Sequence, residues 1–165
     1  MQLRKIISVA IPTAIPTAIL TLCVGSLWAT DACSLLTPAQ VSAVLGVQVG
    51  PGERLVPSNT SMCGWSEPGH KGLSDKKVVL SLYTQLGTRT PMDRFNTAKT
   101  PVQGVTKDPV SGIGDEAFYS TASGLGTTLV VRKGNTPFHV AVHGFPVEQV
   151  KEKEKTLAGE ILSKL

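Results

Sequence analysis

The clearest structural signal in the chain is the stretch TTLVVRKGNTPFHVAVHG, residues 127–144. It contains two runs rich in β-branched and apolar residues, 127–134 and 137–144, of the kind that is typical of strands. Gly134 and Asn135 lie in the junction, and this pair favours a tight turn between two strands. The sequence therefore predicts an antiparallel β-hairpin here.

Strand patterns recur on the N-terminal side of this hairpin. In KKVVLSLYTQ, residues 76–85, Val78, Leu80 and Leu82 share one face of an extended chain. The expected additional strands are 47–56, 60–67, 76–85 and 115–121. The segment that passes through Gly104 and Pro109 is expected to be a loop.

Three helices are predicted from capping residues and from apolar spacing. In LTPAQVSAVLG, Thr37 is a suitable N-cap, Pro38 fits the first helical position and Gly46 fits the stop. The C-terminal segment repeats apolar residues at helical spacing, and Glu154 falls near that apolar stripe, where it fits poorly. The predicted helices lie within 36–46, 89–100 and 146–165.

The resulting order of elements is α-β-β-β-α-β-β-β-α. An order of this kind is most simply packed as a mainly antiparallel sheet of about six strands that is covered by helices. The sequence therefore predicts an α+β sandwich, formed by a single domain that spans residues 30–165.

Residues 1–29 differ in composition from the rest of the chain. Arg4 and Lys5 precede a long run without charged residues, and small residues follow it. This layout is typical of a secretory signal peptide, with cleavage expected before Thr30. The alternative is an uncleaved membrane anchor, because the apolar run is long for a signal.

The charge balance of the remaining 136 residues argues against nucleic acid as a partner. Removal of residues 1–29 takes away Arg4 and Lys5, which leaves 14 basic and 12 acidic side chains and a formal charge of +2. The basic residues are dispersed and form no cluster of the kind that nucleic-acid binding needs.

The cysteine content predicts one disulfide in the exported domain. Cys23 would leave with the signal peptide, so that Cys33 and Cys63 remain. Two thiols in an exported domain are normally oxidised to one disulfide. Free thiols in a reducing compartment are the alternative, which the signal peptide disfavours.

The motif GIGDEAFY, residues 112–119, presents two adjacent carboxylates after a glycine-rich turn. Consecutive residues of a strand point to opposite faces, so Asp115 and Glu116 are poorly placed to act on one substrate atom. Gly112 and Gly114 can adopt backbone conformations that other residues avoid, and Asp115 can satisfy backbone N–H groups of the turn. We interpret the motif as a structural turn into a strand; a catalytic or metal-binding pair is the alternative.

His139 and His143 form the most obvious candidate metal pair. Because they lie in a predicted strand, a spacing of four residues separates them by about 13 Å. Both cannot then bind one zinc ion at ~2 Å, and a site at either would need a further ligand such as His70. We expect polar structural positions and assign no metal, cofactor or catalytic residue.

Three motifs in order, ACSLLTPAQVSAVLG (32–46), CGW (63–65) and GIGDEAFY (112–119), followed by an amphipathic terminal helix, resemble a family of small exported proteins known as domain of unknown function 3558. Many members of that family are lipoproteins, whereas this chain lacks a matching lipidation motif. The resemblance implies an α/β/α sandwich similar to the PsbP fold and a disulfide between Cys33 and Cys63. It implies no known reaction.

Together these patterns favour a non-catalytic exported domain that binds a protein, an envelope component or a small ligand. It would be periplasmic, secreted or associated with the cell envelope. One alternative is a structural envelope protein that stays in the membrane through residues 1–29. Another is a small hydrolase or metal-dependent enzyme that uses Asp115, His139 and His143.

Overall fold

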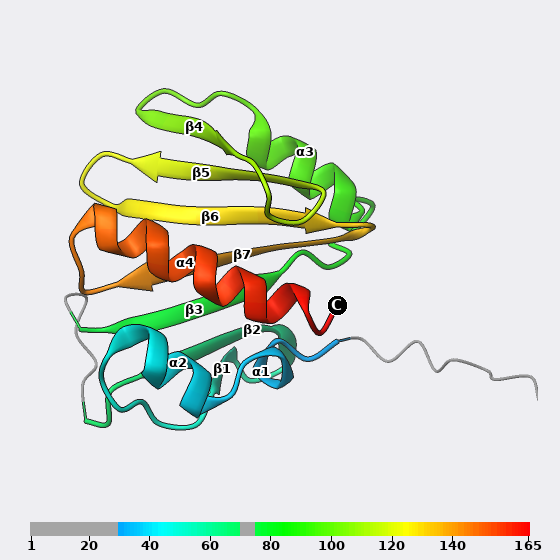
Figure 1. Cartoon of the computed structure of the whole chain (residues 1–165). Coiled ribbons are helices and arrows are strands. Elements are labelled where there is room, and N and C mark those ends of the chain that lie inside the picture. The colour runs from blue at the N-terminus through cyan, green and yellow to red at the C-terminus, as the bar shows by residue number, and fades with distance from the viewer. Residues whose placement is uncertain (1–29, 70–74) are drawn as a thin grey trace, which may run out of the picture.

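The computed structural model describes residues 30–69 and 75–165, and its centre is one antiparallel sheet of seven strands (Figure 1). The strand order across the sheet is β1-β2-β3-β7-β6-β5-β4, and every neighbouring pair is antiparallel. The strands are β1 (Glu53–Val56), β2 (Asn59–Ser66), β3 (Lys77–Leu82), β4 (Val105–Val110), β5 (Glu116–Ala122), β6 (Gly126–Lys133) and β7 (Thr136–His143). The mixed α+β content and the antiparallel sheet agree with the sequence prediction.

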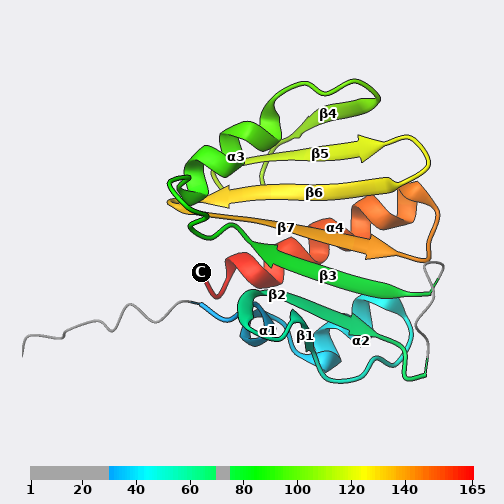
Figure 2. The ribbon, with the colours of Figure 1, turned by 180° about the vertical axis from the view of Figure 1, so that it is seen from behind.

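Helices lie on both faces of the sheet. Three of them, α1, α2 and α4, lie on one face, and α3 lies on the other, as the two opposite views show (Figures 1 and 2). The helices are α1 (Ala32–Leu35), α2 (Pro38–Leu45), α3 (Pro91–Lys99) and α4 (Val147–Leu162). The longest helix, α4, packs across β6 and β7 at the middle of the sheet.

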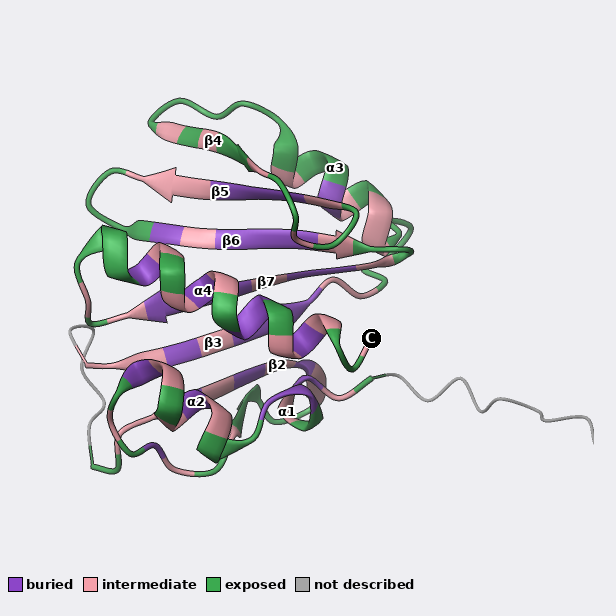
Figure 3. Cartoon of the chain, in the orientation of Figure 1, coloured by how far each residue is buried: buried purple, intermediate pink, exposed green. Residues whose placement is uncertain are grey.

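The main hydrophobic core lies between the sheet and α1, α2 and α4. Buried residues are concentrated in the central strands and on the sheet-facing side of α4 (Figure 3). Among the largest side chains without solvent exposure are Trp65, Phe138, Leu129, Leu157 and Ile161. Burial of an apolar side chain of this size contributes roughly 1.5–3 kcal/mol, so this layer dominates the stability of the fold.

A smaller core lies beneath α3 and leaves part of that sheet face uncovered. Phe95 of α3 packs on Phe118 of β5 and Val130 of β6. Within the described residues, no helix lies over β1, β2 or the first half of β3 on this side (Figure 2). We call the uncovered side of these three strands the open face; Leu55, Gly64, Ser66, Lys77 and Val79 lie on it.

The helix starts follow local capping chemistry. Thr37 accepts a hydrogen bond from the backbone N–H of Gln40, whose side chain in turn accepts from the backbone N–H of Thr37. The same reciprocal arrangement joins Thr90 and Asp93 at the start of α3. Such capping boxes satisfy backbone donors that the helix itself leaves free, which is why these starts could be predicted locally.

The fold differs from the sequence prediction in three main places. It has seven strands rather than six, because residues 105–110 form β4 instead of a loop. Pro109 is tolerated there because β4 is an edge strand that pairs only with β5. In addition, β1 is confined to residues 53–56 of the predicted 47–56, and a short helix, α1, precedes α2.

A disulfide fastens the N-terminal part of the domain to the sheet. It joins Cys33 of α1 to Cys63 of β2, with Cα atoms 5.1 Å apart. The expected signal peptide, residues 1–29, lies outside the described residues. Within the ranges that the structure describes, no helix is both long and apolar enough to cross a bilayer.

Candidate functional site

The GIGDEAFY motif lies against the turn between β6 and β7. Gly112 and Gly114 both have positive φ angles, 78° and 58°. The carboxylate of Asp115 accepts a hydrogen bond from the backbone N–H of Gly134 at 2.7 Å and contacts the guanidinium of Arg132 at 3.2 Å. Asp115 thereby ties the start of β5 to the hairpin turn that follows β6.

Glu116 extends the same ion-pair network towards α3. Its carboxylate pairs with Lys99 of α3 and approaches Arg132 Nε at 3.7 Å. The two adjacent carboxylates therefore share Arg132 as a partner but do not converge on a common cavity. These ion pairs could not be predicted, because the Lys99 pair depends on α3 packing beside β5 and the Arg132 pairs depend on the register of β5 and β6.

His139 and His143 occupy different environments along β7. His139 packs edge-on against the ring of Tyr83, with ring centroids 5.5 Å apart, and burial lowers its pKa to about 4. Burial also lowers the pKa of His143, and the adjacent positive charge of Lys77 adds to this effect. Both imidazoles are therefore neutral at pH 7.

The candidate catalytic residues do not come together. Asp115 bonds to Gly134 before β7 begins, whereas His143 is the last residue of β7. In the two described ranges, no group of three His, Cys, Asp or Glu side chains is arranged to hold a metal ion. His70, the further ligand considered from the sequence, lies outside the described residues.

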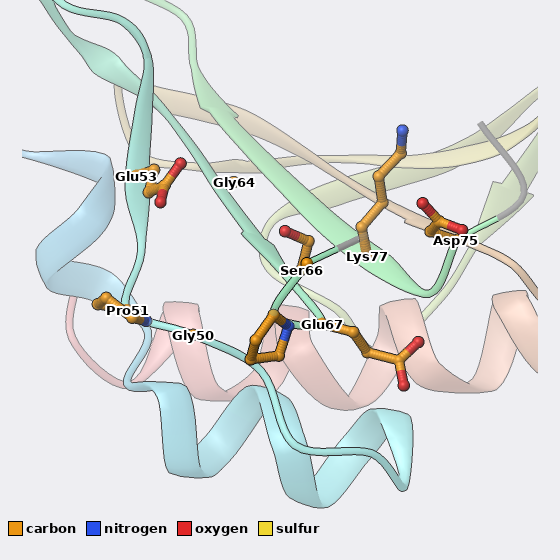
Figure 4. Close-up of a pocket in the computed structure, with 10 residues that line it drawn as sticks. Gly50, Pro51, Glu53, Gly64, Ser66, Glu67, Asp75 and Lys77 are labelled. Carbon is orange, nitrogen blue, oxygen red and sulfur yellow. The ribbon is translucent and has the colours of Figure 1, made fainter. Parts of the chain in front are cut away.

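A cleft of about 440 Å³ opens at one end of the open face (Figure 4). The side chains of Glu53, Ser66 and Lys77 reach it from β1, β2 and β3, while Glu67 and Asp75 come from the segments beside β2 and β3. The remaining lining residues are Gly50, Pro51, Gly64, Pro68 and Gly69. Small residues leave the backbone accessible, so the cleft offers both charged side chains and peptide groups to a ligand.

The register of the strands explains why the cleft forms here. Gly64 lies opposite Glu53 on β1, and the Leu55 side chain covers the space that a Cβ at residue 64 would occupy. Ser66 is paired with Lys77, and Lys77 is in turn paired with His143. Because Gly64 and Ser66 of β2 are small, they leave a hollow between the longer side chains of β1 and β3.

The charge of the cleft is predominantly negative. Three carboxylates, Glu53, Glu67 and Asp75, and one ammonium group, Lys77, line it. Within the described residues, Glu53 and Glu67 have no ion pair, unlike the carboxylates of the β5 network. An unpaired carboxylate on a concave surface attracts cations, because a low-dielectric wall focuses its field.

The sequence pattern does not predict this cleft. Its residues come from three separate stretches, and only the Gly- and Pro-rich composition of 50–69 hints at an irregular surface. Glu154 is the other feature whose role the sequence leaves open: it is fully buried beneath α4.

Comparison of the chain with protein-family models, with curated proteins and with solved structures found no match.

Proposed function

We propose that this protein is an exported, non-catalytic binding module whose ligand occupies the cleft and the adjoining open face. The cleft itself carries this proposal: it is a concave site on the open face, the side of β1, β2 and β3 that no described helix covers. A second hollow of about 200 Å³ adjoins it, where Leu55 is 48% exposed and Val79 is half-buried. Concave sites that combine apolar walls with a few charged groups are typical of ligand binding.

The charges indicate the class of ligand. Because Glu53 and Glu67 lack ion-pair partners among the described residues, each would interact favourably with a positively charged group of a ligand. A basic segment of a partner protein fits this chemistry, as does an amine-bearing envelope component or small ligand. Apolar contact with Leu55 and Val79 would then add affinity through burial.

Export from the cytoplasm is part of the same proposal. The disulfide between Cys33 and Cys63 supports it, because such bonds persist in oxidising compartments. The charge and apolar pattern of residues 1–29 supports a signal peptide, with a retained anchor as the alternative. The order of motifs and the helices on both sheet faces support membership of the domain of unknown function 3558 family and a PsbP-like sandwich.

The test is a comparison of what three forms of the protein capture from the native envelope. The forms are the wild type, the cleft variant Glu53→Lys with Glu67→Lys, and the control variant Glu148→Lys with Glu152→Lys on the exposed side of α4. Both double variants change the net charge equally, so non-specific attraction is matched.

The expected result is a component that the wild type and the α4 control retain and that the cleft variant loses. Capture of the same components by all three forms would exclude the cleft as the binding site. A photo-crosslinker placed at Val79, which lies on the open face, should label the same component.

A further inference from the structure

Glu154 is the one acidic or basic side chain that is fully buried in the described part of the chain. It lies on the face of α4 that also carries Val150, Leu157 and Ile161, the residues that hold the helix on the sheet. A carboxyl group in such a place opposes burial unless it is neutral or fully hydrogen-bonded. Its surroundings therefore decide how firmly α4 docks.

The side chain enters the sheet where β6 and β7 separate. Pairing between these strands runs from Leu129 opposite Val140 to Lys133 opposite Thr136, and it stops before Val142. The two strands diverge beneath α4 in both views (Figures 1 and 2). Glu154 Oε1 accepts the backbone N–H of Val142 at 3.1 Å, so the carboxyl group replaces a missing hydrogen bond of the sheet.

The two oxygens of this carboxyl group differ in their surroundings. Oε1 accepts the hydrogen bond from the backbone N–H of Val142. Oε2 is buried and has no hydrogen-bond partner. A negative charge on this group would leave one oxygen without a donor, which is costly in an apolar setting.

Few charged or titratable groups face Glu154. Among the residues that the structure describes, Lys151 of α4 and Tyr119 of β5 are the ones that interact with it, while β6 and β7 offer backbone groups. The Tyr119 hydroxyl donates to the carbonyl of Lys151, so it is committed elsewhere. Burial outweighs the hydrogen bonds and the weak attraction of Lys151, and it raises the pKa of Glu154 to about 8.

We propose that Glu154 is a pH-sensitive latch that holds α4 on the sheet as a neutral carboxylic acid and releases the helix when it ionises. On ionisation the proton goes to solvent, and the buried carboxylate regains hydration only if α4 lifts from the opening between β6 and β7. Other contacts of α4, the hydrogen bonds from Lys133 Nζ to the carbonyl of Leu162 and from Lys153 Nζ to the carbonyl of Val44, do not involve Glu154. The latch thus responds to mild alkalinity through one residue.

The proposal is tested by hydrogen exchange of the α4 amides at pH 6 and pH 8, corrected for the intrinsic exchange rate. If Glu154 is neutral when α4 is docked and ionised when it is lifted, the opening equilibrium of the wild type should rise roughly 50-fold over this range. Glu154→Gln should show no comparable rise. The matched control Glu152→Gln, on the exposed side of the same helix, should behave like the wild type.

A second measurement needs no variant and covers the case in which Glu154→Gln fails to fold. The ¹³C carboxyl resonance of Glu154 in the wild type should titrate near pH 8. Titration below pH 6, or equal α4 protection at both pH values, would overturn the proposal.

Discussion

At the scale of single residues, Gly114 is the glycine, among those described, where an added side chain would be tolerated least. It has a φ of 58°, and a Cβ placed there would come within 2.5 Å of the carbonyl oxygen of Arg132. Gly112 is a matched control, because its φ is 78° but a Cβ would meet nothing within 4 Å. We expect Gly112→Ala to cost about 1–2 kcal/mol for backbone strain alone. Gly114→Ala should cost a further 1–3 kcal/mol or so, because the backbone of β6 must shift.

Urea unfolding of the two variants beside the wild type measures this difference. Equal losses would mean that the β6 contact at Gly114 carries no energetic weight.

For Asp115 and Glu154, the sequence indicates a role but not the hydrogen-bond partner. A turn role for Asp115 could be inferred from its type and its glycine neighbours, but its partner, Gly134, is 19 residues away and is brought near only by the β5–β6 pairing. Glu154 could be recognised as a poor fit to the apolar stripe of its helix. Its hydrogen bond to Val142 could not, because this depends on where β6 and β7 part.

At the scale of secondary-structure elements, α4 contains a glycine whose replacement should stabilise the helix. Gly159 lies inside the helix, it is exposed, and a Cβ there would meet nothing within 4 Å. Because glycine in a helix interior is about 1 kcal/mol less favourable than alanine, Gly159→Ala should stabilise the protein by ~0.5–1 kcal/mol. Thermal unfolding would measure the gain, and a lower melting temperature would mean that residue 159 serves a purpose other than helix continuity.

The elements that could be predicted are those whose signals are local. The caps at Thr37 and Thr90 define helix starts through residues three positions apart. Strand β4 could not be predicted because Pro109 argues against a central strand, whereas a proline is tolerated in a strand at the edge of the sheet. The cleft could not be predicted either, because β1, β2 and β3 form it together and no single strand has a sequence pattern that indicates it.

At the scale of the whole molecule, the disulfide joins the N-terminal helices to the sheet. The two cysteines are 30 residues apart, and closing a loop of this length stabilises a fold by about 3–4 kcal/mol in the chain-entropy model. Cys33→Ser should therefore lower the melting temperature markedly, and reduction of the wild type should have a similar effect. Peptide mapping without reductant should recover the Cys33–Cys63 pair; recovery of two free thiols from exported protein would contradict the assignment.

The pH dependence of stability combines two buried groups with opposite signs. The pKa of His139 falls from 6.5 to about 4 on folding. The neutral imidazole's contribution to the free energy of unfolding is therefore complete above pH 6.5 and is lost as the pH falls towards 4. The pKa of Glu154 rises from 4.5 to about 8, so its contribution is complete below pH 4.5 and is lost as the pH rises towards 8. Each group changes the free energy of unfolding by about 1.4 kcal/mol per pH unit inside its window.

Between pH 4.5 and 6.5 the two slopes cancel, so we expect a plateau for the wild type, followed by a loss of about 2 kcal/mol between pH 6.5 and pH 8. Glu154→Gln should remove the alkaline loss and leave a stability that rises from pH 4 to 6.5 and then stays level. His139→Phe should instead remove the loss of stability at acid pH, so that stability falls continuously from pH 4.5 to 8. Urea unfolding at half-unit pH steps would separate the three profiles. A wild-type optimum at pH 8 would contradict the burial of a neutral Glu154 and, with it, the balance of the two groups.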